Sequence, residues 1–443
     1  MMSIKVGMVS LGCPKNQTDA EIMLSLLKEG GYEITGDENA ADVIIVNTCG
    51  FIAEAKQEAI DNILELAELK KAGSLKSIIV TGCMAERYRD EILSEMPEVD
   101  AVVGIGSNKN ICSVVKNVLG GCKYSEYGEK TDLLMDNTRI LTSPSYTAYI
   151  RIADGCDNKC TYCAIPMIRG GFRSRTIESV LDEAKTLAQN GVRELVLIAQ
   201  DTTRYGEDLY GKSALPQLLT ELSLIDGIRW IRILYTYPER ITDELIDVMA
   251  SNDKILKYLD IPMQHASDNV LKRMNRKSDN KSLRSLIDKL RRKMPDITIR
   301  TTFIVGFPGE TEEDFATLCE FIKDMKFNRA GCFTYSEEEG TPAAEFDGKI
   351  DEQVKQDRYD ILMTEQSVVN EQLLDGIIGK QITVLIEGYD SMNKCHYGRS
   401  EMDAPEIDGK VFIVSKTPKY NAGEFVECII TDTLDYDLLA ESL

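Results

Sequence analysis

The chain has 443 residues, of which 43% are hydrophobic and 28% charged, and its net charge is −22. This length predicts two to four domains. The short apolar runs exclude a membrane span, and the acidity argues against a protein held mainly on phosphate backbones, which requires Lys and Arg. Residues 1–5 lead directly into an apolar run, without a signal-peptide core. We expect a cytoplasmic protein, in which twelve cysteines indicate metal or redox chemistry rather than disulfides.

Residues 1–125 alternate apolar runs with helical patterns, which is typical of a parallel sheet covered by helices on both faces. We expect a three-layer Rossmann-like or flavodoxin-like domain there, and a linker from Gly120 to Ser145. The apolar runs are Lys5–Leu11, Val43–Asn47, Ser77–Thr81 and Ala101–Gly104, and the helical stretches are Asp19–Glu29, Ala53–Lys71, Arg87–Glu95 and Asn110–Val118.

A cysteine follows each of the first three runs by two residues, as Cys13, Cys49 and Cys83. The carboxyl ends of parallel strands open on one edge of the sheet, so these three side chains are expected to meet. Glycines 12, 50 and 82 flank them and allow close backbone approach. The pattern predicts an iron–sulfur cluster held by three thiolates; buried structural thiols are the alternative.

Residues 140–370 contain six further apolar runs separated by helical patterns, and the repeat predicts a parallel, partial (β/α)6 barrel with its function on the loops after the strands. The runs are Thr147–Ala153, Glu194–Gln200, Trp230–Leu234, Tyr258–Pro262, Ile297–Val305 and Arg329–Tyr335, and the helical stretches are Thr176–Asn190, Leu215–Ile225, Asp243–Ser251, Lys281–Lys293 and Glu312–Lys326.

Three cysteines stand close together after the first of these six runs, as Cys156, Cys160 and Cys163. An iron–sulfur cubane normally takes four cysteines, one per iron, so three leave one iron open. An open coordination position is what catalytic metal sites keep. Structural zinc and unligated thiols are the alternatives, and the lack of a fourth Cys or His shortly downstream weighs against zinc.

Other strand-end residues are candidates for cofactor binding. They are Gln200 after the second run, His265 after the fourth, and Gly306, Gly309 and Glu310 after the fifth. The last loop is also explained by a turn and a capping box between Thr311 and Asp314, and His265 by simple packing. A cationic cluster, Arg169, Arg173 and Arg175, either holds carboxylates of cofactor or substrate or is surface charge at a helix start.

Residues 374–443 follow a charged helical connector, Asp351–Leu374, and show short alternating runs with Gly-rich turns. This pattern predicts a small OB-like β-barrel. The segment has 13 acidic against 6 basic residues. An RNA-binding barrel is expected to be basic or to carry stacking aromatics, so this composition favours a basic protein ligand. The runs are Gln381–Glu387, Lys394–Ser400, Lys410–Val414 and Phe425–Asp432.

The loop that carries Cys156, Cys160 and Cys163, with Tyr162 before the last cysteine, resembles the signature of the radical S-adenosylmethionine (SAM) enzymes. With its six cysteines and a terminal barrel similar to a TRAM domain, nearly the whole chain resembles the methylthiotransferases. The stretches 10–16, 47–52 and 155–166 resemble the branch that modifies an aspartate of ribosomal protein S12. The tRNA branch usually has Gln-Met-Asn where this chain has Pro14-Lys15-Asn16. Thr161-Tyr162 departs from the Ser-Phe that is frequent in the ribosomal branch.

The resemblance implies two 4Fe–4S clusters, with Cys156, Cys160 and Cys163 holding the one that binds SAM, and with SAM as both radical source and methyl donor. It implies a basic ribosomal protein as substrate, free or within the ribosomal particle. It also implies an electron donor such as flavodoxin or ferredoxin, and no membrane. Two alternatives stay open: a tRNA adenosine methylthiotransferase, and an iron–sulfur electron-transfer or binding protein that never cleaves SAM.

Overall fold

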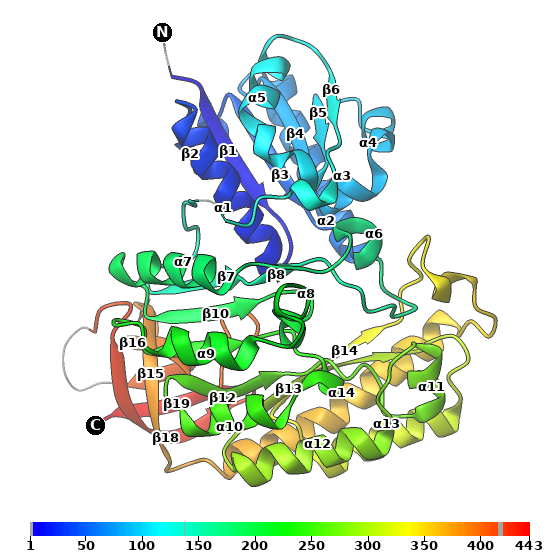
Figure 1. Cartoon of the computed structure of the whole chain (residues 1–443), viewed down its shortest axis with the longest axis vertical. Helices are drawn as coiled ribbons and strands as arrows, with labels where there is room; N and C mark the ends of the chain where they lie inside the picture. The colour runs from blue at the N-terminus through cyan, green and yellow to red at the C-terminus, as the bar shows by residue number, and fades with distance from the viewer. Residues whose placement is uncertain (1–2, 137, 415–419) are drawn as a thin grey trace.

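The computed structural model describes residues 3–136, 138–414 and 420–443. Figure 1 shows that the amino-terminal part of the chain forms a parallel sheet with helices on its faces. A second parallel sheet lies below it, and a small barrel lies at the side of the second sheet. None of the described helices combines the length and the apolar character needed to cross a membrane.

The first sheet has six parallel strands in the order β2-β1-β3-β4-β5-β6. Its strands are β1 (Lys5–Ser10), β2 (Glu33–Thr35), β3 (Val43–Thr48), β4 (Ser77–Gly82), β5 (Ala101–Val103) and β6 (Tyr124–Glu126), and its helices are α1 (Pro14–Glu29), α2 (Ala53–Lys71), α3 (Cys83–Tyr88), α4 (Asp90–Glu95) and α5 (Ile111–Leu119).

Both faces of this sheet are apolar, because alternate residues of a strand point to opposite sides. Val43 and Ile45 pack in the core under α1 and α5, whereas Ile44 and Val46 pack in the core under α2, α3 and α4. A strand that is buried on both faces needs apolar residues at every position, which explains the continuous apolar runs in the sequence. The expected three-layer α/β fold is confirmed.

Three local expectations were wrong. Helix α1 begins at Pro14 and not at Asp19, because Pro is favoured at the first helical position, where its missing N–H is no loss. The single helix expected over 87–95 is two, α3 and α4, separated by Arg89 at φ 47°. Strand β6 lies inside the expected linker and pairs with β5 at the edge of the sheet.

The second sheet is open and has six parallel strands in the order β14-β13-β12-β11-β10-β7, which confirms the partial barrel. Its strands are β7 (Thr147–Arg151), β10 (Glu194–Ile198), β11 (Trp230–Ile233), β12 (Ile255–Asp260), β13 (Thr298–Val305) and β14 (Arg329–Thr334), with a short ribbon of β8 (Ala153–Asp154) and β9 (Arg173–Ser174). Its helices are α6 (Ile165–Arg169), α7 (Ile177–Gln189), α8 (Glu207–Tyr210), α9 (Leu215–Ser223), α10 (Asp243–Ser251), α11 (Asp268–Arg273), α12 (Asn280–Lys293), α13 (Glu312–Met325) and α14 (Glu352–Asp375).

The C-terminal strands form the expected closed barrel in the order β15-β16-β17-β19-β18. Its last strand was not predicted, and it closes the barrel by pairing with both β17 and β18. The expected run 410–414 is confirmed as β17, and residues 415–419, which follow it, lie outside the described residues. The strands are β15 (Gln381–Asp390), β16 (Cys395–Ser400), β17 (Val411–Val414), β18 (Phe425–Leu434) and β19 (Asp437–Ser442).

The barrel covers the inner face of the second sheet. Along β10, Leu195 and Leu197 pack toward the helices, while Val196 and Ile198 share a core with Leu385 and other barrel residues. The ring centroid of Trp230 on β11 lies 4.8 Å from that of Phe425 in an edge-to-face contact. The barrel is therefore packed onto the sheet and is not an appended module on a free linker.

A buried charge network accompanies this contact. Glu194 on β10 accepts hydrogen bonds from Arg399 of the barrel at 2.6 Å and from Arg232 at 3.0 Å. Burial alone raises the pKa of Glu194, but the two arginines outweigh it and lower this pKa from 4.5 to about 2. The ionised carboxylate thus stabilises the folded state above pH 4.5, and this contribution is lost as the pH falls toward 2.

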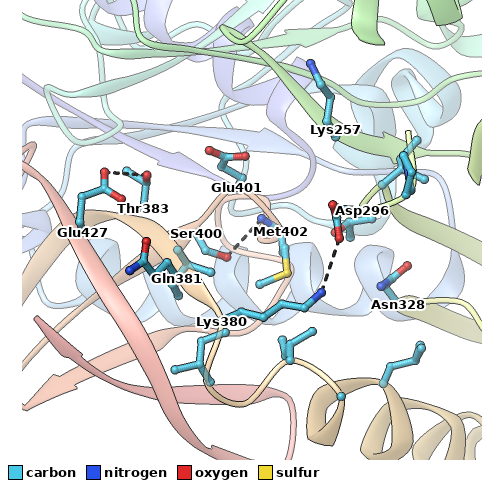
Figure 2. Close-up of a pocket in the computed structure, with 18 of the residues that line it drawn as sticks. Lys257, Asp296, Asn328, Lys380, Gln381, Thr383, Ser400, Glu401, Met402 and Glu427 are labelled. Atoms are coloured by element: carbon cyan, nitrogen blue, oxygen red, sulfur yellow. Dashed lines mark hydrogen bonds and ion pairs between the residues drawn. The ribbon is translucent and has the colours of Figure 1, made fainter. Parts of the chain in front are cut away.

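A cavity of about 820 Å³ lies where the barrel, α14 and the amino-terminal edge of the second sheet meet. Figure 2 shows Lys380 reaching Asp296 and Thr383 bonded to Glu427 along its walls. Catalytic groups of such folds lie at the opposite, carboxyl edge of the strands. This cavity is therefore part of the seam between barrel and sheet.

We expect Arg399→Met to lower the free energy of unfolding by about 3–5 kcal/mol, because it leaves the buried Glu194 with one cation fewer and removes the partner of the half-buried Glu387. Urea unfolding of the metal-free protein measures this loss. Lys380→Met is the matched control, since its ion pair with Asp296 is exposed at 3.5 Å, and its effect should be much smaller. Equal losses in the two variants would contradict the assignment.

Candidate functional site

The first three cysteines lie on neighbouring loops at the carboxyl edge of the first sheet. Cys13 is the N-cap of α1 after β1, Cys49 directly follows β3, and Cys83 is the first residue of α3 after β4. Gly12 adopts φ +120°, and a Cβ there would stand 2.9 Å from Cys49 Cβ. The glycine therefore lets the first two cysteine loops touch.

Asn16 ties the three loops together. Its side-chain amide donates to the backbone oxygens of Leu11 at 3.1 Å and Thr48 at 2.7 Å, and its Oδ1 lies 3.8 Å from Cys83 Sγ. Asn47 in turn donates to the Asn16 backbone oxygen at 2.7 Å. One buried amide thus contacts all three cysteine loops, which fixes their relative positions.

The second trio lies on the loop after the β7–β8 segment. The N–H of Cys156 donates to Gly170 O at 3.1 Å, and that of Cys163 donates to Cys160 O at 3.2 Å. Thr161 holds the loop against α11 through Met274 O at 3.1 Å and Arg273 O at 2.8 Å. The loop is thus held to neighbouring segments at its start and in its middle, and a turn at Cys160–Cys163 closes it.

Three of the six thiols are protonated at neutral pH in the absence of a metal. Burial raises the pKa of Cys83 and Cys163 to about 12 and that of Cys156 to about 11, so ligation must displace the protons. Among residues 3–136, 138–414 and 420–443, no three His, Cys, Asp or Glu side chains converge on the position of a single metal ion. A cluster takes one thiolate per iron, so its ligands stand further apart than those around one zinc ion.

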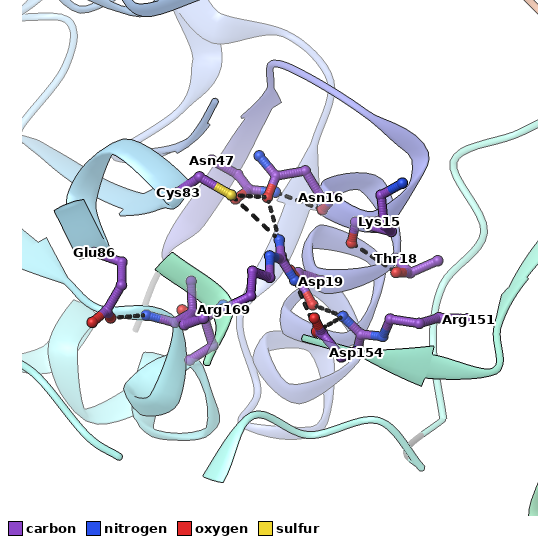
Figure 3. Close-up of polar contacts among 12 residues, drawn as sticks. Lys15, Asn16, Thr18, Asp19, Asn47, Cys83, Glu86, Arg151, Asp154 and Arg169 are labelled. Carbon is purple, nitrogen blue, oxygen red and sulfur yellow. Dashed lines mark hydrogen bonds and ion pairs between the residues drawn. The ribbon is translucent and has the colours of Figure 1, made fainter. Parts of the chain in front are cut away.

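Arg169 joins the two trios. It lies six residues after Cys163, and its guanidinium reaches Asn16 Oδ1 at 2.9 Å and Cys83 Sγ at 3.6 Å in the first trio. The same group pairs with Asp19 of α1 at 2.8 Å and with Asp154, two residues before Cys156, at 3.0 Å. Figure 3 shows this guanidinium between the two carboxylates and Cys83.

Arg151 completes the buried quartet. It pairs with Asp19 and lies 3.3 Å from Asp154, so two arginines face two carboxylates, all at most 2% exposed. The two positive charges lower the pKa of Asp154 against the effect of its burial. The quartet is therefore an ionised, charge-balanced link between α1 and the loop of the second trio.

Lys15 is a second crossing contact. Its Nζ stands 3.1 Å from the centroid of the Tyr235 ring, just after β11, and 3.4 Å from Ala199 O, just after β10. The residue is 7% exposed. Burial lowers the pKa of its ammonium. The amine of Lys15, on the helix that follows β1, is thus held over the carboxyl edge of the second sheet.

The three arginines near the second trio make ion pairs and hydrogen bonds within the protein. Arg175 pairs with Asp136 at 2.6 Å and with Glu183, and Arg173 donates to the backbone oxygens of Lys130, Arg169 and Gly171. With Arg169 in the quartet, these side chains bond internal partners in place of the cofactor carboxylates considered for them.

The candidate cofactor residues fall into two groups. Gln200 lies near the quartet and donates to Asp154 Oδ1 at 3.0 Å. His265 is fully buried, and its Nδ1 accepts from Ser267 N at 2.9 Å. Burial lowers the pKa of His265 to about 3, so it is neutral at physiological pH.

The loop after β13 is closely packed by the protein. A Cβ at Gly306 would stand 2.2 Å from Lys355, and one at Gly309 would stand 2.7 Å from Arg273. Glu310 accepts from Phe307 N at 3.0 Å and pairs with Arg358 at 3.2 Å, and the predicted capping box of Thr311 and Asp314 is confirmed. Cofactor contact by this loop stays a prediction.

Sequence reasoning missed the residues that join the trios: Asp19, Arg151, Asp154 and the role of Asn16. Asp154 stands at the end of an apolar run, directly before the cysteine loop, and this strand-end position was the available signal. Asp19 and Arg169 are 150 residues apart and carry no local pattern that would pair them.

Three protein-family models match the chain: Uncharacterized protein family UPF0004 over residues 5–104, the Radical SAM superfamily over 150–322, and the TRAM domain over 378–443. The chain is 51% identical over 438 residues to a protein of Lachnoclostridium phytofermentans, covering 98% of this chain and 99% of the relative. It is 50% identical over 445 residues to one of Clostridioides difficile, covering 99% of each. Both are named ribosomal protein uS12 methylthiotransferase RimO.

Two solved structures share the fold. One is the radical SAM methyltransferase TsrM from Kitasatospora setae with cobalamin and a [4Fe–4S] cluster, at a TM-score of 0.58 and 15% identity over 77% of each chain. The other is the cobalamin-dependent SAM radical enzyme OxsB, at a TM-score of 0.52 and 13% identity, covering 84% of this chain and 56% of that one. At these identities the likeness concerns the fold alone.

We expect Arg169→Met to lower the free energy of unfolding by about 3–5 kcal/mol, since Asp19 and Asp154 would stay buried with one cation between them. The loss is measured by urea unfolding of the metal-free protein. Arg173→Met is the matched control, because Arg173 bonds only backbone oxygens in the described residues. A loss for Arg173→Met as large as that for Arg169→Met would show that the quartet has no special role.

Proposed function

The chain belongs to the RimO family of radical SAM methylthiotransferases, and from this membership we propose that it adds a methylthio group to the β-carbon of an aspartate in ribosomal protein uS12. The relatives reported above carry the uS12 name at about 50% identity over nearly the full length of both chains, so this substrate is favoured over tRNA. We propose residues 1–125, 140–370 and 374–443 as its cluster-binding, radical SAM and TRAM domains.

The observation that carries the proposal is that Arg169 contacts Cys83 of the first trio and pairs with Asp154, which lies two residues before the first cysteine of the second trio. Radical SAM membership implies SAM and one 4Fe–4S cluster, which we assign to Cys156, Cys160 and Cys163. We assign a second 4Fe–4S cluster to Cys13, Cys49 and Cys83. When bound, these groups supply the radical that removes a hydrogen atom from the target carbon, the sulfur atom that replaces it, and, with a second SAM, the methyl group.

The chain's own residues orient and enclose the reaction. Asn16 positions the loops of the first trio, and the quartet of Asp19, Arg151, Asp154 and Arg169 holds the second trio against it. Gln200 bonds Asp154 at the mouth of the second sheet, where we propose that it borders the SAM site. Asn16 and the quartet are buried and Gln200 is half-buried, so little water reaches the residues that link the two trios.

Two partners and a compartment follow from the family. The substrate is the basic protein uS12, alone or in the ribosomal particle, and the cytoplasm is where the two would meet. A one-electron donor such as flavodoxin or ferredoxin is required to reduce the SAM-binding cluster. We also propose Gly306, Gly309, Glu310 and His265 as residues that border the cofactor site from the β12 and β13 loops.

The test of the function is a reaction of the reconstituted enzyme with SAM, dithionite and either uS12 or tRNA. We expect uS12 to gain the mass of an added SCH₂ unit and SAM to yield 5′-deoxyadenosine. A mass gain on tRNA alone would assign the chain to the other branch. Absence of 5′-deoxyadenosine from a fully loaded sample would exclude radical SAM chemistry altogether.

The two-cluster assignment is tested by iron analysis. The reconstituted chain should hold roughly eight irons, as two cubanes require. Replacing Cys13, Cys49 and Cys83 together by Ala should leave roughly four irons and retain SAM cleavage. The same replacement of Cys156, Cys160 and Cys163 should leave a similar iron content but abolish SAM cleavage. A wild-type chain that never exceeds roughly four irons would refute the second cluster.

A further inference from the structure

Two buried cations differ from the others in the described residues. Ten Lys and Arg residues are buried there, and eight of them lie within 4.0 Å of a carboxylate. Lys15 and Arg276 have no such partner in the described part of the chain. Buried charges are costly unless they are paired, so each exception calls for an explanation in terms of something the cation binds.

Both exceptions stand at the cysteine trios. Arg276 lies 3.8 Å from the ring centroid of Tyr237, whose hydroxyl is 3.5 Å from Cys160 Sγ. Lys15 follows Cys13 by two residues and reaches across to the second sheet. Of the two, only Lys15 extends from the first sheet to the carboxyl edge of the second, where a substrate atom must reach both trios.

No carboxylate of the described residues pairs directly with Lys15. It lies in the first turn of α1, a helix of 16 residues, whose amino-terminal end carries the positive pole of the helix dipole. Besides the thiol of Cys13, the acidic groups that act on it through space are Asp154 and Asp260, which are already held by Arg169 at 3.0 Å and by Arg300 at 3.1 Å. The ring of Tyr235 and the backbone oxygen of Ala199 are the groups that its ammonium contacts.

We propose that Lys15 is a specificity-determining residue, which binds the side-chain carboxylate of the target aspartate. The proposal deepens the proposed function and rests on it. In an aspartate the carboxylate carbon is bonded directly to the β-carbon that receives the sulfur. A cation beside Cys13 and over the ends of β10 and β11 would thus hold the reacting carbon between the two trios.

The test compares the binding of two forms of uS12 to the cluster-loaded enzyme. One form is natural, and in the other the target aspartate is replaced by asparagine, which keeps the shape and removes the charge. Wild-type enzyme should bind the aspartate form roughly 30-fold or more tightly than the asparagine form, as expected for one side of a buried charge pair. In Lys15→Met, which keeps an apolar stem of similar length, the two forms should bind within about threefold of each other.

Lys28→Met is the matched control, because Lys28 is an exposed lysine in the last turn of the same helix. This variant should keep the full preference for the aspartate form. Iron content and thermal unfolding, measured on each variant, show whether Lys15→Met is folded and loaded. If it is not, Lys15→Gln is used in the same comparison.

The possible outcomes separate this inference from the function on which it rests. Unchanged preference in Lys15→Met overturns the inference, and so does a wild-type enzyme that modifies uS12 without distinguishing the two forms in binding. A weaker SAM affinity with unchanged preference would assign Lys15 to the cofactor carboxylate, and a shifted cluster potential with unchanged preference would make it a counterion of the cluster. A wild-type enzyme that neither binds nor modifies uS12 refutes the proposed function itself.

Discussion

The arrangement of the molecule depends on buried charges that are paired across its three parts. The inner face of the open second sheet carries charged side chains along its whole length, including Arg151, Glu194, Arg232 and Asp260. An open sheet cannot satisfy them by itself, and water is excluded from most of this face. The first sheet supplies partners at the carboxyl end of the strands, and the barrel supplies them at the other end.

This pairing explains why Cys83 of the first trio packs against Ala164 and Ile168, which follow the last cysteine of the second trio. Packing of apolar surfaces tolerates small shifts, but a charge quartet such as Asp19, Arg151, Asp154 and Arg169 is satisfied in one arrangement only. Such networks add little to the free energy of unfolding compared with apolar side chains in the same place. Removing one member alone is strongly destabilising, because it leaves a buried charge without a partner. Their contribution here is position: the quartet fixes α1, and with it Cys13, relative to the loop of Cys156.

Most of the fold was predictable because the strands are buried on both faces. Continuous apolar runs such as 43–47 and 77–81 are sufficient to locate such strands, and the cysteines that follow them are then placed by topology alone. Strands β2 and β6 escaped because they are three residues long and lie at the sheet edges, with sequences Glu-Ile-Thr and Tyr-Ser-Glu. The contacts between domains were not predicted for a different reason: an ion pair between residues far apart in the chain produces no periodic pattern in the sequence.

The charge of the barrel shows how composition and structure complement each other. Its acidic excess, counted from the sequence, favoured a basic protein partner. Several of the carboxylates behind that count are used internally, because Glu387 pairs with Arg399, Asp403 with Arg329 and Asp408 with Arg300.

The charge available to attract the proposed protein substrate is therefore what remains at the surface, on residues such as Glu406, Asp432 and Asp435, which are exposed. Exposed charges act through screened, long-range attraction and influence the rate of encounter more than the final fit. Discrimination at the reacting carbon then has to come from a buried group, where a single charge is not screened. Among the residues that the structure describes, the buried cation without a carboxylate partner that lies between the two sheets is Lys15.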